Sequence, residues 1–179
     1  MVTPQNTVLA LVDIQVKLAA VMDRREDLIR RLVQLARGCQ ILGLPILLAE
    51  QNPERMGPTI PELREVLPDL APHPKMTFSC WRDPAWAAAL KALGRDRVLL
   101  AGIETHVCIA QTAADLVSAG YAVEVVADAV SSRLPADKAI GLDQIKSAPA
   151  VITCVESVLF ELLGTAEHPA FKEILRLVK

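Results

Sequence analysis

The sequence predicts a single α/β domain with a three-layer, Rossmann-like fold, in which helices cover both faces of a mostly parallel sheet. Two observations carry this prediction. Short apolar runs, each with the length of one buried strand, recur along the chain, and stretches with helical spacing separate them. Strands that alternate with helices form right-handed βαβ units. Because 179 residues suit one domain, we assign residues 1–179 to it.

The first strand is predicted at Thr7 to Asp13, a run that is apolar until the acid that closes it. From Asp23 the apolar residues follow a spacing of three and four, which places one stripe on a helix that ends at Gly43. A strand followed by a crossover helix is the expected start of a βαβ unit. The stripe consists of Leu28, Leu32, Leu35, Cys39 and Leu42.

Further apolar runs predict the other strands, and marked ends define two helices. The stretch DPAWAAALKALG has Asp83 as N-cap and Pro84 at the first helical position, and it ends at Gly94. The stretch HVCIAQTAADLVSAG ends similarly at Gly120. The predicted strands are Pro45–Glu50, Arg97–Ile103, Ala122–Asp128 and Ala150–Glu156.

Two segments lie outside this alternation. Gln51 to Arg82 holds six of the twelve prolines and is predicted as loop with a short helix near PELREVL. Long loops in a compact domain usually have a function, so we expect this segment to wall a site. Near the end of the sequence, an apolar stripe predicts a helix that packs on the domain. Its residues are Phe171, Ile174, Leu175 and Val178.

Composition narrows the class of partner. With 52% hydrophobic residues, 22% charged residues and a net charge of -2, the chain resembles an ordinary soluble globular protein. Aromatic residues make up only 3%, so stacking platforms for bases are scarce and nucleic acid is not expected. No apolar run has the length of a membrane span, and the start MVTPQNTVLALVD lacks signal-peptide features. We therefore expect a cytoplasmic protein without a membrane partner.

The cysteines and histidines give no pattern of a disulfide scaffold or a metal site. The four cysteines are far apart, no CxxC pair occurs, and each is expected to be a free thiol. The histidines, His73, His106 and His168, form no cluster with metal-ligand spacing. The glycine-rich phosphate-binding patterns are also absent, so no nucleotide cofactor is suggested. The cysteines are Cys39, Cys80, Cys108 and Cys154.

Polar residues gather where predicted strands end. In an open α/β sheet, ligands lie beyond the carboxyl ends of the strands, where the strand order reverses. Asp13, Glu50 and the corner Gly102 to Cys108 all fall at that edge. Cys108 lies where a helix begins, and the helix dipole favours the thiolate there, although a buried free cysteine is often only a small apolar residue. Asp13 has an alternative role as a helix cap or solvated strand end.

The remaining candidates carry less weight by themselves. Lys75 lies in the proline-bordered loop, which would reach back over the strand ends, yet a lysine is usually a solvated surface charge. Cys39 and Cys154 fit buried positions, on a helix stripe and inside a strand, whereas Cys80 lies in the polar stretch FSCWR. The tryptophans are expected to be packing residues, and Trp81, near Lys75, is also a pocket candidate.

Three segments together resemble the signature segments of the isochorismatase-like cysteine hydrolases. They are LVDIQ with Asp13, HPKMTFS with Lys75 and GIETHVCI with Cys108. The resemblance extends from about Thr7 to Phe160 by the order of strands and helices. The segment AEQNPERMGPTIPEL resembles one in the branch of isochorismatase-domain proteins, most of which lack an assigned substrate.

The resemblance implies a site and a chemistry. Asp13, Lys75 and Cys108 would form a catalytic triad, and the peptide bond between Ile103 and Glu104 would be cis. The N–H groups of Glu104 and Cys108 would form an oxyanion hole. The implied activity is a cysteine hydrolase that cleaves a small amide-type C–N bond through a thioester, without cofactor. True isochorismatases cleave a vinyl ether without relying on the cysteine, so the presence of Cys108 favours a carbonyl substrate.

Departures from the family pattern and open alternatives remain. Nicotinamidases carry an aspartate and two histidine metal ligands after the second strand, whereas EQNPERMGPTIPEL contains no histidine, so we expect no metal. Glu104 would place an acid beside the oxyanion hole and select a cationic or amide-bearing ligand. The main alternative function is a catalytically silent scaffold or binding protein, and another is a redox sensor at Cys108.

The partners expected from the resemblance are a small-molecule substrate and further copies of the same chain. The resemblance allows a dimer, a tetramer or an octamer, and the sequence does not choose among them. Residues that line the substrate pocket are predicted from their position near the strand ends. They are Gln15, Glu50, Gln51, Phe78 and Trp81.

Overall fold

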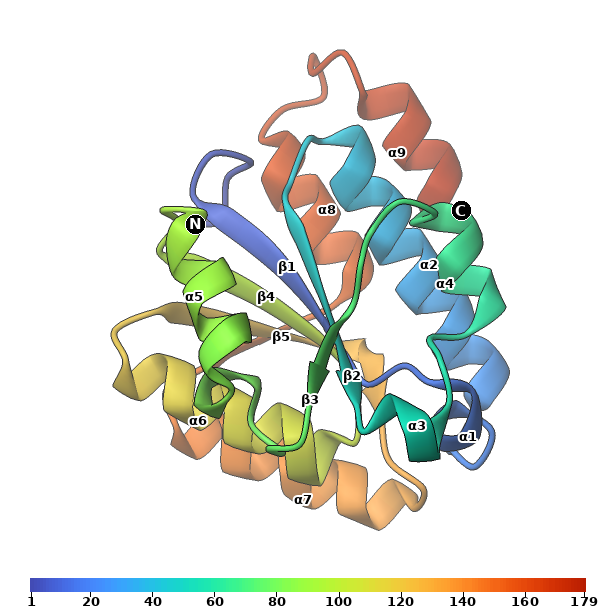
Figure 1. Cartoon of the computed structure of the whole chain (residues 1–179). Helices are drawn as coiled ribbons and strands as arrows, with labels where there is room; N and C mark the ends of the chain where they lie inside the picture. The colour runs from blue at the N-terminus through green and yellow to red at the C-terminus, as the bar shows by residue number, and fades with distance from the viewer.

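Six parallel strands form one sheet in the computed structural model, which describes residues 1–179. Their order is β3-β2-β1-β4-β5-β6, and each neighbouring pair is parallel, so the predicted α/β fold is confirmed (Figure 1). The order reverses between β1 and β4, which places the topological switch point beyond their carboxyl ends. The strands are β1 Thr7–Val12, β2 Ile46–Gln51, β3 His73–Lys75, β4 Arg97–Ile103, β5 Ala122–Ser131 and β6 Val151–Thr153.

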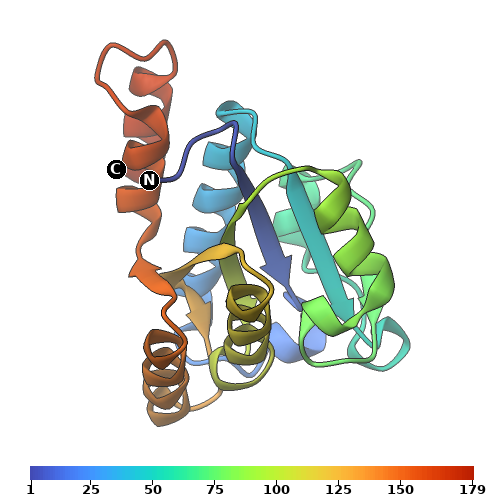
Figure 2. The ribbon, with the colours of Figure 1, turned by 90° about the vertical axis from the view of Figure 1, so that its left-hand side faces the viewer.

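Helices cover both faces of the sheet (Figure 2). One face packs against α2, α4, α8 and α9, and the other against α5, α6 and α7. A 3₁₀ turn at Cys80–Arg82 precedes α5, and a π-helical turn at Thr105–Ile109 precedes α6. The helices are α1 Val16–Ala19, α2 Arg25–Ile41, α3 Pro53–Met56, α4 Pro61–Val66, α5 Pro84–Ala92, α6 Ala110–Ser118, α7 Pro135–Ser147, α8 Val155–Leu163 and α9 Phe171–Val178.

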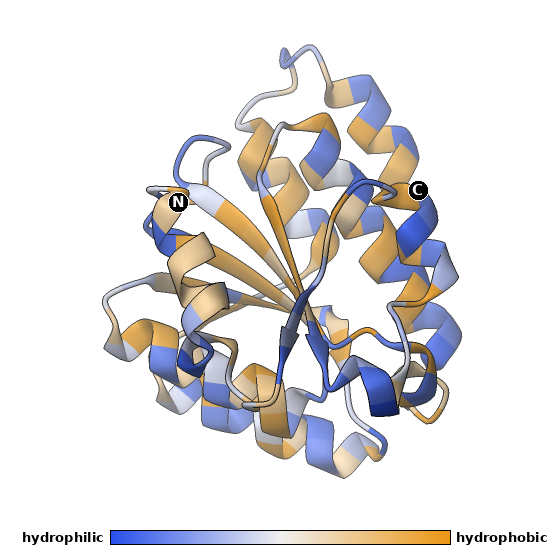
Figure 3. Ribbon diagram, viewed as in Figure 1, coloured by the Kyte–Doolittle hydropathy of each residue, from blue (hydrophilic) through white to orange (hydrophobic).

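The central strand β1 contributes to two separate apolar cores, which explains why its sequence is apolar throughout. Leu9 and Leu11 belong to the larger core, on the side of α2 and α8. Val8, Ala10 and Val12 belong to the smaller core, on the side of α5 and α6. Successive side chains of a strand point to opposite faces, so a strand buried on both faces needs apolar residues at every position. Figure 3 shows the apolar strands between helices whose outer faces are polar.

The helix predictions with marked ends are confirmed. The Asp83 side chain accepts hydrogen bonds from the N–H groups of Ala85 and Trp86, which caps α5. The stripe on α2 is buried in the larger core. In α9, Ile174 is fully buried, and the Gln34 side chain donates to the carbonyl of Leu177, so α9 packs on its own domain. None of the helices is both long and apolar enough to cross a bilayer.

Two local predictions are wrong. In Gln51–Arg82 the predicted short helix near PELREVL is present as α4, but the prediction that the rest is loop misses α3 and the short edge strand β3. Pro74 in the middle of β3 argues against a strand in the sequence, because proline has no N–H to donate to a neighbouring strand. It is tolerated here because β3 is an edge strand. The last strand is also shorter than predicted, and Cys154 lies at the N-cap of α8 rather than inside a strand.

Candidate active site

Asp13 follows β1 at the switch point and turns its side chain into the interior. Its backbone has φ 58°, in the left-handed region that aspartate tolerates better than most residues. Gly102 of β4 lies opposite Val12, and a side chain at Gly102 would collide with the Val12 carbonyl. The bare glycine backbone lets β1 and β4 meet closely at the place where both lead into the site.

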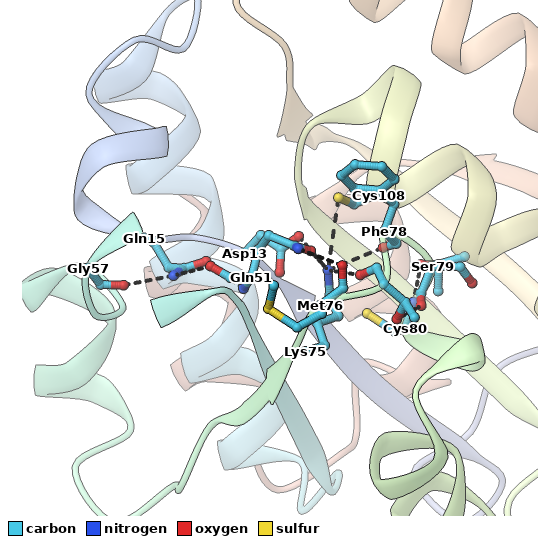
Figure 4. Close-up of polar contacts among 12 residues, drawn as sticks. Asp13, Gln15, Gln51, Gly57, Lys75, Met76, Phe78, Ser79, Cys80 and Cys108 are labelled. Atoms are coloured by element: carbon cyan, nitrogen blue, oxygen red, sulfur yellow. Dashed lines mark hydrogen bonds and ion pairs between the residues drawn. The ribbon is translucent and has the colours of Figure 1, made fainter. Parts of the chain in front are cut away.

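Lys75 is the last residue of β3, and its ammonium lies at the centre of the site (Figure 4). Nζ is 2.8 Å from Asp13 Oδ2 and 4.0 Å from Cys108 Sγ. It also donates to Gln51 Oε1 at 2.7 Å and to the carbonyl oxygens of Thr77 and Phe78 at 3.1 and 3.2 Å. The ammonium is therefore a buried cation inside the sheet edge, and the alternative of a solvated surface charge is wrong.

Cys108 lies in the π-helical turn between β4 and α6. The Glu104 carbonyl accepts hydrogen bonds from the N–H groups of Val107 and Ile109, which fixes the turn around the cysteine. The peptide bond between Ile103 and Glu104 is cis. The Glu104 N–H has no hydrogen-bond acceptor within the chain. The corner thus presents a thiol and an unpaired backbone donor one turn apart.

Burial isolates the three side chains from water. The exposed fractions of Asp13, Lys75 and Cys108 are 0%, 2% and 6%. Burial raises the pKa of Asp13, although Lys75 opposes the shift. Burial disfavours the Lys75 ammonium, but Asp13 and the neighbouring thiols more than offset this, so the pKa of Lys75 is raised overall. At rest the site therefore holds an ammonium.

Burial also raises the pKa of the Cys108 thiol, and the Asp13 carboxylate adds to this shift while Lys75 lowers it. The resting cysteine is consequently a thiol rather than a thiolate. Asp13 Oδ1 is buried and has no hydrogen-bond partner among the other residues, in contrast to Oδ2, which Lys75 holds. A carboxylate oxygen with a free lone pair and a raised pKa is suited to take up a proton.

Two of the predicted pocket residues form hydrogen bonds to residues 57–59 instead of lining a free pocket. The Gln15 side chain donates to the carbonyls of Gln51 and Gly57, and it is fully buried. Glu50 Oε1 accepts from the backbone N–H and the hydroxyl of Thr59, at 2.7 and 2.6 Å. Both side chains fasten residues 57–59 to the ends of β1 and β2, so the structure gives them partners other than a ligand.

The other three pocket candidates differ in placement. Gln51 contacts Lys75 directly. Phe78 is 54% exposed, and its backbone carbonyl accepts a hydrogen bond from the Lys75 ammonium at 3.2 Å (Figure 4). Trp81 does not belong to this group. Its ring packs edge-on against Tyr121, 5.4 Å between centroids, and Lys91 lies over it. Tyr121 precedes β5, so Trp81 packs near the amino ends of the strands, away from the site, and its assignment to the pocket is corrected.

The Glu104 side chain is not a free acid beside the corner. Its Oε2 accepts hydrogen bonds from the backbone N–H and from Nε of Arg133, both at 3.1 Å. The guanidinium therefore neutralises the carboxylate, which removes the reason for expecting Glu104 to select a cationic ligand. Arg133 directly follows the buried residue Ser132, beyond the end of β5.

The side chains after β2 do not offer a metal-ligand set of the nicotinamidase kind. Glu50 is committed to Thr59, Gln51 to Lys75, and no histidine lies in the segment. No group of three or more histidine, cysteine, aspartate or glutamate side chains is placed to hold an ion. The donors here thus do not fit that metal, and the expectation of metal independence stays a prediction.

One neighbour of the corner has only a weak signal in the sequence. Gly141 of α7 packs against the backbone of Thr105 and His106, so closely that a Cβ atom at this position would collide with it. An isolated glycine inside a helical stretch often has a packing reason, and this is the only signal of the contact in the sequence. The role of Gln51 beside Lys75 has no comparable signal, because it depends on the pairing of β2 with β3.

A doubly wound parallel sheet with a buried carboxylate, ammonium and thiol at its switch point defines an α/β protein whose candidate site lies where such sheets usually bind ligands. The chain belongs to the isochorismatase family, whose domain model, Isochorismatase domain, matches residues 7–157. The family resemblance of the sequence is thereby confirmed.

Known proteins agree with this assignment. Isochorismatase domain-containing protein 1 of Salmo salar is 38% identical over 176 residues, which are 98% of this chain and 62% of that protein. The structure of MAR1 ribonuclease from Caenorhabditis elegans superposes with a TM-score of 0.91 at 35% identity, covering 99% of this chain and 91% of that one. The YcaC gene product of Escherichia coli, described as an octameric hydrolase of unknown specificity, shares the fold with a TM-score of 0.89 at 22% identity, covering 98% and 94%.

Proposed function

We propose that this protein is a metal-independent cysteine hydrolase that cleaves a small amide-type C–N bond through a thioester. The observation that carries the proposal is the buried Lys75 ammonium, 2.8 Å from Asp13 Oδ2 and 4.0 Å from Cys108 Sγ. A cation between a carboxylate and a thiol stabilises the thiolate as it forms, while the carboxylate supplies the base. The family of the chain, with its hydrolase fold, supports the same class of enzyme.

The first half of the reaction forms the thioester. Asp13 Oδ1 takes the Cys108 proton, and the thiolate attacks the carbonyl carbon of the substrate. The carbonyl oxygen becomes an oxyanion, which the N–H groups of Glu104 and Cys108 stabilise. The tetrahedral intermediate collapses, the C–N bond breaks, and Asp13 returns its proton to the leaving amine.

The second half releases the acid. Asp13, again a carboxylate, takes a proton from a water molecule that attacks the thioester carbon. The C–S bond breaks, the carboxylic acid leaves, and the proton on Asp13 returns to Cys108. Lys75 stays an ammonium throughout, and its charge compensates first the thiolate and then the developing hydroxide. Neither half requires a cofactor.

The access to the site supports a small-molecule substrate. Since Cys108 is only 6% exposed, the thiol is within reach of a small molecule rather than a bulky one. We place the protein in the cytoplasm and expect it to form a homo-oligomer, in keeping with the octamer described for YcaC. Neither nucleic acid nor membrane is an expected partner.

The test is the rate of iodoacetamide labelling at each cysteine across pH, read by mass spectrometry. Lys75→Met should move the labelling of Cys108 to higher pH, because the thiolate loses its cation. Asp13→Asn should move it to lower pH, because the neighbouring negative charge is gone. Opposite shifts in the two variants are the signature of a coupled triad, with circular dichroism used to verify that both fold.

Turnover is then measured on a panel of small amides by release of the amine or ammonia. Cys108→Ala should abolish turnover while keeping the fold. Because the MAR1 neighbour is described as a ribonuclease, RNA is included in the panel. Full activity of Cys108→Ala on any substrate, RNA included, would contradict the proposal.

The second candidate function is a binding or scaffold protein without turnover. The closed site and the raised pKa of Cys108 favour it, since both suit a thiol that only packs. In that case the labelling of Cys108 is slow, and neither Asp13→Asn nor Lys75→Met changes its rate. The same experiment therefore separates the two functions.

A further inference from the structure

The side chain of Gln51 is fixed at both ends of its amide. Its Oε1 accepts a hydrogen bond from Lys75 Nζ at 2.7 Å, and its Nε2 donates to the carbonyl of Met76 at 3.0 Å. The backbone of Gln51 is fixed as well, because Gln15 accepts from its N–H and donates to its carbonyl. Since an amide held at both ends has one orientation, its oxygen is the end that faces Lys75.

The sheet register gives Gln51 this position. Gln51 of β2 pairs with Lys75 of β3, and both are the last residues of their strands. The N–H of Asn52 donates to the Lys75 carbonyl at 3.0 Å and continues the pairing one residue further. The two side chains therefore leave the sheet edge next to each other and point into the site (Figure 4).

The contacts of Nζ divide into short and long ones. The two short contacts, 2.7 and 2.8 Å, go to Gln51 and Asp13. The carbonyls of Thr77 and Phe78 are at 3.1 and 3.2 Å, and Cys108 Sγ is at 4.0 Å. An ammonium has three hydrogens, so one remains for the carbonyls or for the sulfur once the short contacts are made. That hydrogen can turn to the thiolate while both short contacts stay in place.

We infer that Gln51 is a positioning residue that holds the Lys75 ammonium within reach of both Asp13 and Cys108 through a neutral acceptor. The inference rests on the proposed function, in which the ammonium stabilises the Cys108 thiolate. Neutrality is the essential property. A carboxylate at this place would hold the ammonium equally well but would cancel its charge, and the thiolate would then face two carboxylates and one cation.

The test compares three variants by the pH dependence of Cys108 alkylation. Gln51→Glu keeps the size and adds a charge, and Gln51→Leu removes the acceptor without adding one. Gln34→Glu is the matched control, because the Gln34 side chain also accepts from a cation, Arg31, and donates to a backbone carbonyl, that of Leu177, on the outer helices. Cys154, half-buried and remote from Lys75, reports labelling in the same sample.

For Gln51→Glu, the profile of Cys108 should move to higher pH by about one unit or more, which corresponds to about tenfold slower labelling at a fixed pH below the midpoint. Gln51→Leu should move it in the same direction by less, and Gln34→Glu should not move it. A wild-type profile in Gln51→Glu would overturn the inference. If Gln51→Glu fails to fold, a wild-type profile in Gln51→Leu would overturn it instead.

The outcomes also separate this inference from the proposed function. If Lys75→Met moves the Cys108 profile and neither Gln51 variant does, the triad stands and only the role of Gln51 is lost. If Lys75→Met leaves the profile unchanged, the proposed function itself fails. A shift of equal size in Gln51→Leu and Gln51→Glu would also overturn the inference, because the neutrality of the acceptor would then have no effect.

Discussion

Gly141 of α7 lies directly against the backbone of His106: a Cβ atom on Gly141 would be 2.7 Å from the His106 nitrogen. His106 belongs to the turn that carries Cys108, so α7 supports the corner of the site from outside. The atoms that would collide are backbone atoms, which cannot rotate away as a side chain does. Any side chain at Gly141 must therefore move either α7 or the corner.

The first prediction concerns Gly141→Ala. The variant should lose about 1–3 kcal/mol of unfolding free energy through overpacking, and turnover should fall because the corner is displaced. Urea unfolding and Cys108 labelling measure the two effects. The matched control is Gly38→Ala, whose Cβ would meet the side chain of Leu159 in the core away from the site. It should lose stability with Cys108 labelling unchanged, and equal labelling in both variants would count against a supporting role of α7.

The second prediction concerns the buried ion pair. Lys75→Met alone leaves the Asp13 carboxylate buried without its cation, and should cost about 3–5 kcal/mol of unfolding free energy at pH 7. The double variant Asp13→Asn with Lys75→Met should recover most of this stability while staying inactive. Denaturant unfolding of the single and double variants measures the coupling. Arg30→Ala, which breaks an exposed pair with Asp27, is the control and should change stability far less. Additive losses in the double variant would contradict the prediction.

The third prediction is a loss of stability in alkali. Burial raises the pKa of Cys39 to about 12 in the folded protein, from 9.0 for a free thiol. Above pH 9 the unfolded chain therefore releases the Cys39 proton before the folded chain does, so stability falls as the pH rises from 9 towards 12. The slope from this thiol is about 1.4 kcal/mol per pH unit.

Cys39→Ala removes that slope. At pH 7 the variant should be less stable than the wild type, because it leaves a cavity in the larger core. The difference between the two proteins should shrink as the pH rises above 9. Urea unfolding at pH 7, 9 and 10.5 measures it, and a difference that stays constant over this range would disprove the assignment.

The fourth prediction concerns the N-cap of α5. Asp83 accepts from two backbone N–H groups, at 3.1 and 3.0 Å, so Asp83→Ala should cost about 1 kcal/mol. Asp83→Ser keeps an acceptor and should lose much less. Thermal unfolding compares the two variants, and Cys108 labelling should be unchanged in both. Equal stability of the alanine and serine variants would refute the cap.

The parts of the fold that depend on local pattern could be predicted from the sequence. The strand at Thr7 is indicated by a continuous apolar run, and the helix from Arg25 by apolar residues spaced three and four apart. The start of α5 is indicated by Asp83, a residue type that caps helices. Asp13 and Cys108 could be placed at one edge because the carboxyl ends of parallel strands meet there. These inferences need no knowledge of which strands are neighbours.

The missed features depend on pairing between distant segments. The edge strand His73–Lys75 has three residues and a central proline, too little for a periodic signal, so the sequence predicts a loop at Lys75. Trp81 is close to Lys75 in sequence, yet the 3₁₀ turn directs it towards Tyr121. The sequence predicts the correct sheet edge for Gln15 and Glu50, but they bind Gly57 and Thr59, and no pattern in the sequence connects these residues to them.

Lys75 lies on a three-residue edge strand, so it is held less stably than the other two residues of the candidate triad. Asp13 and Cys108 are attached to the centre of the sheet, which opens only with the whole molecule, whereas an edge strand paired on one side can detach by itself. Each such opening withdraws the ammonium and leaves the carboxylate and thiol behind. The lifetime of the assembled site is therefore that of the edge strand β3, and we expect mild denaturant to abolish activity while the core is still protected from hydrogen exchange.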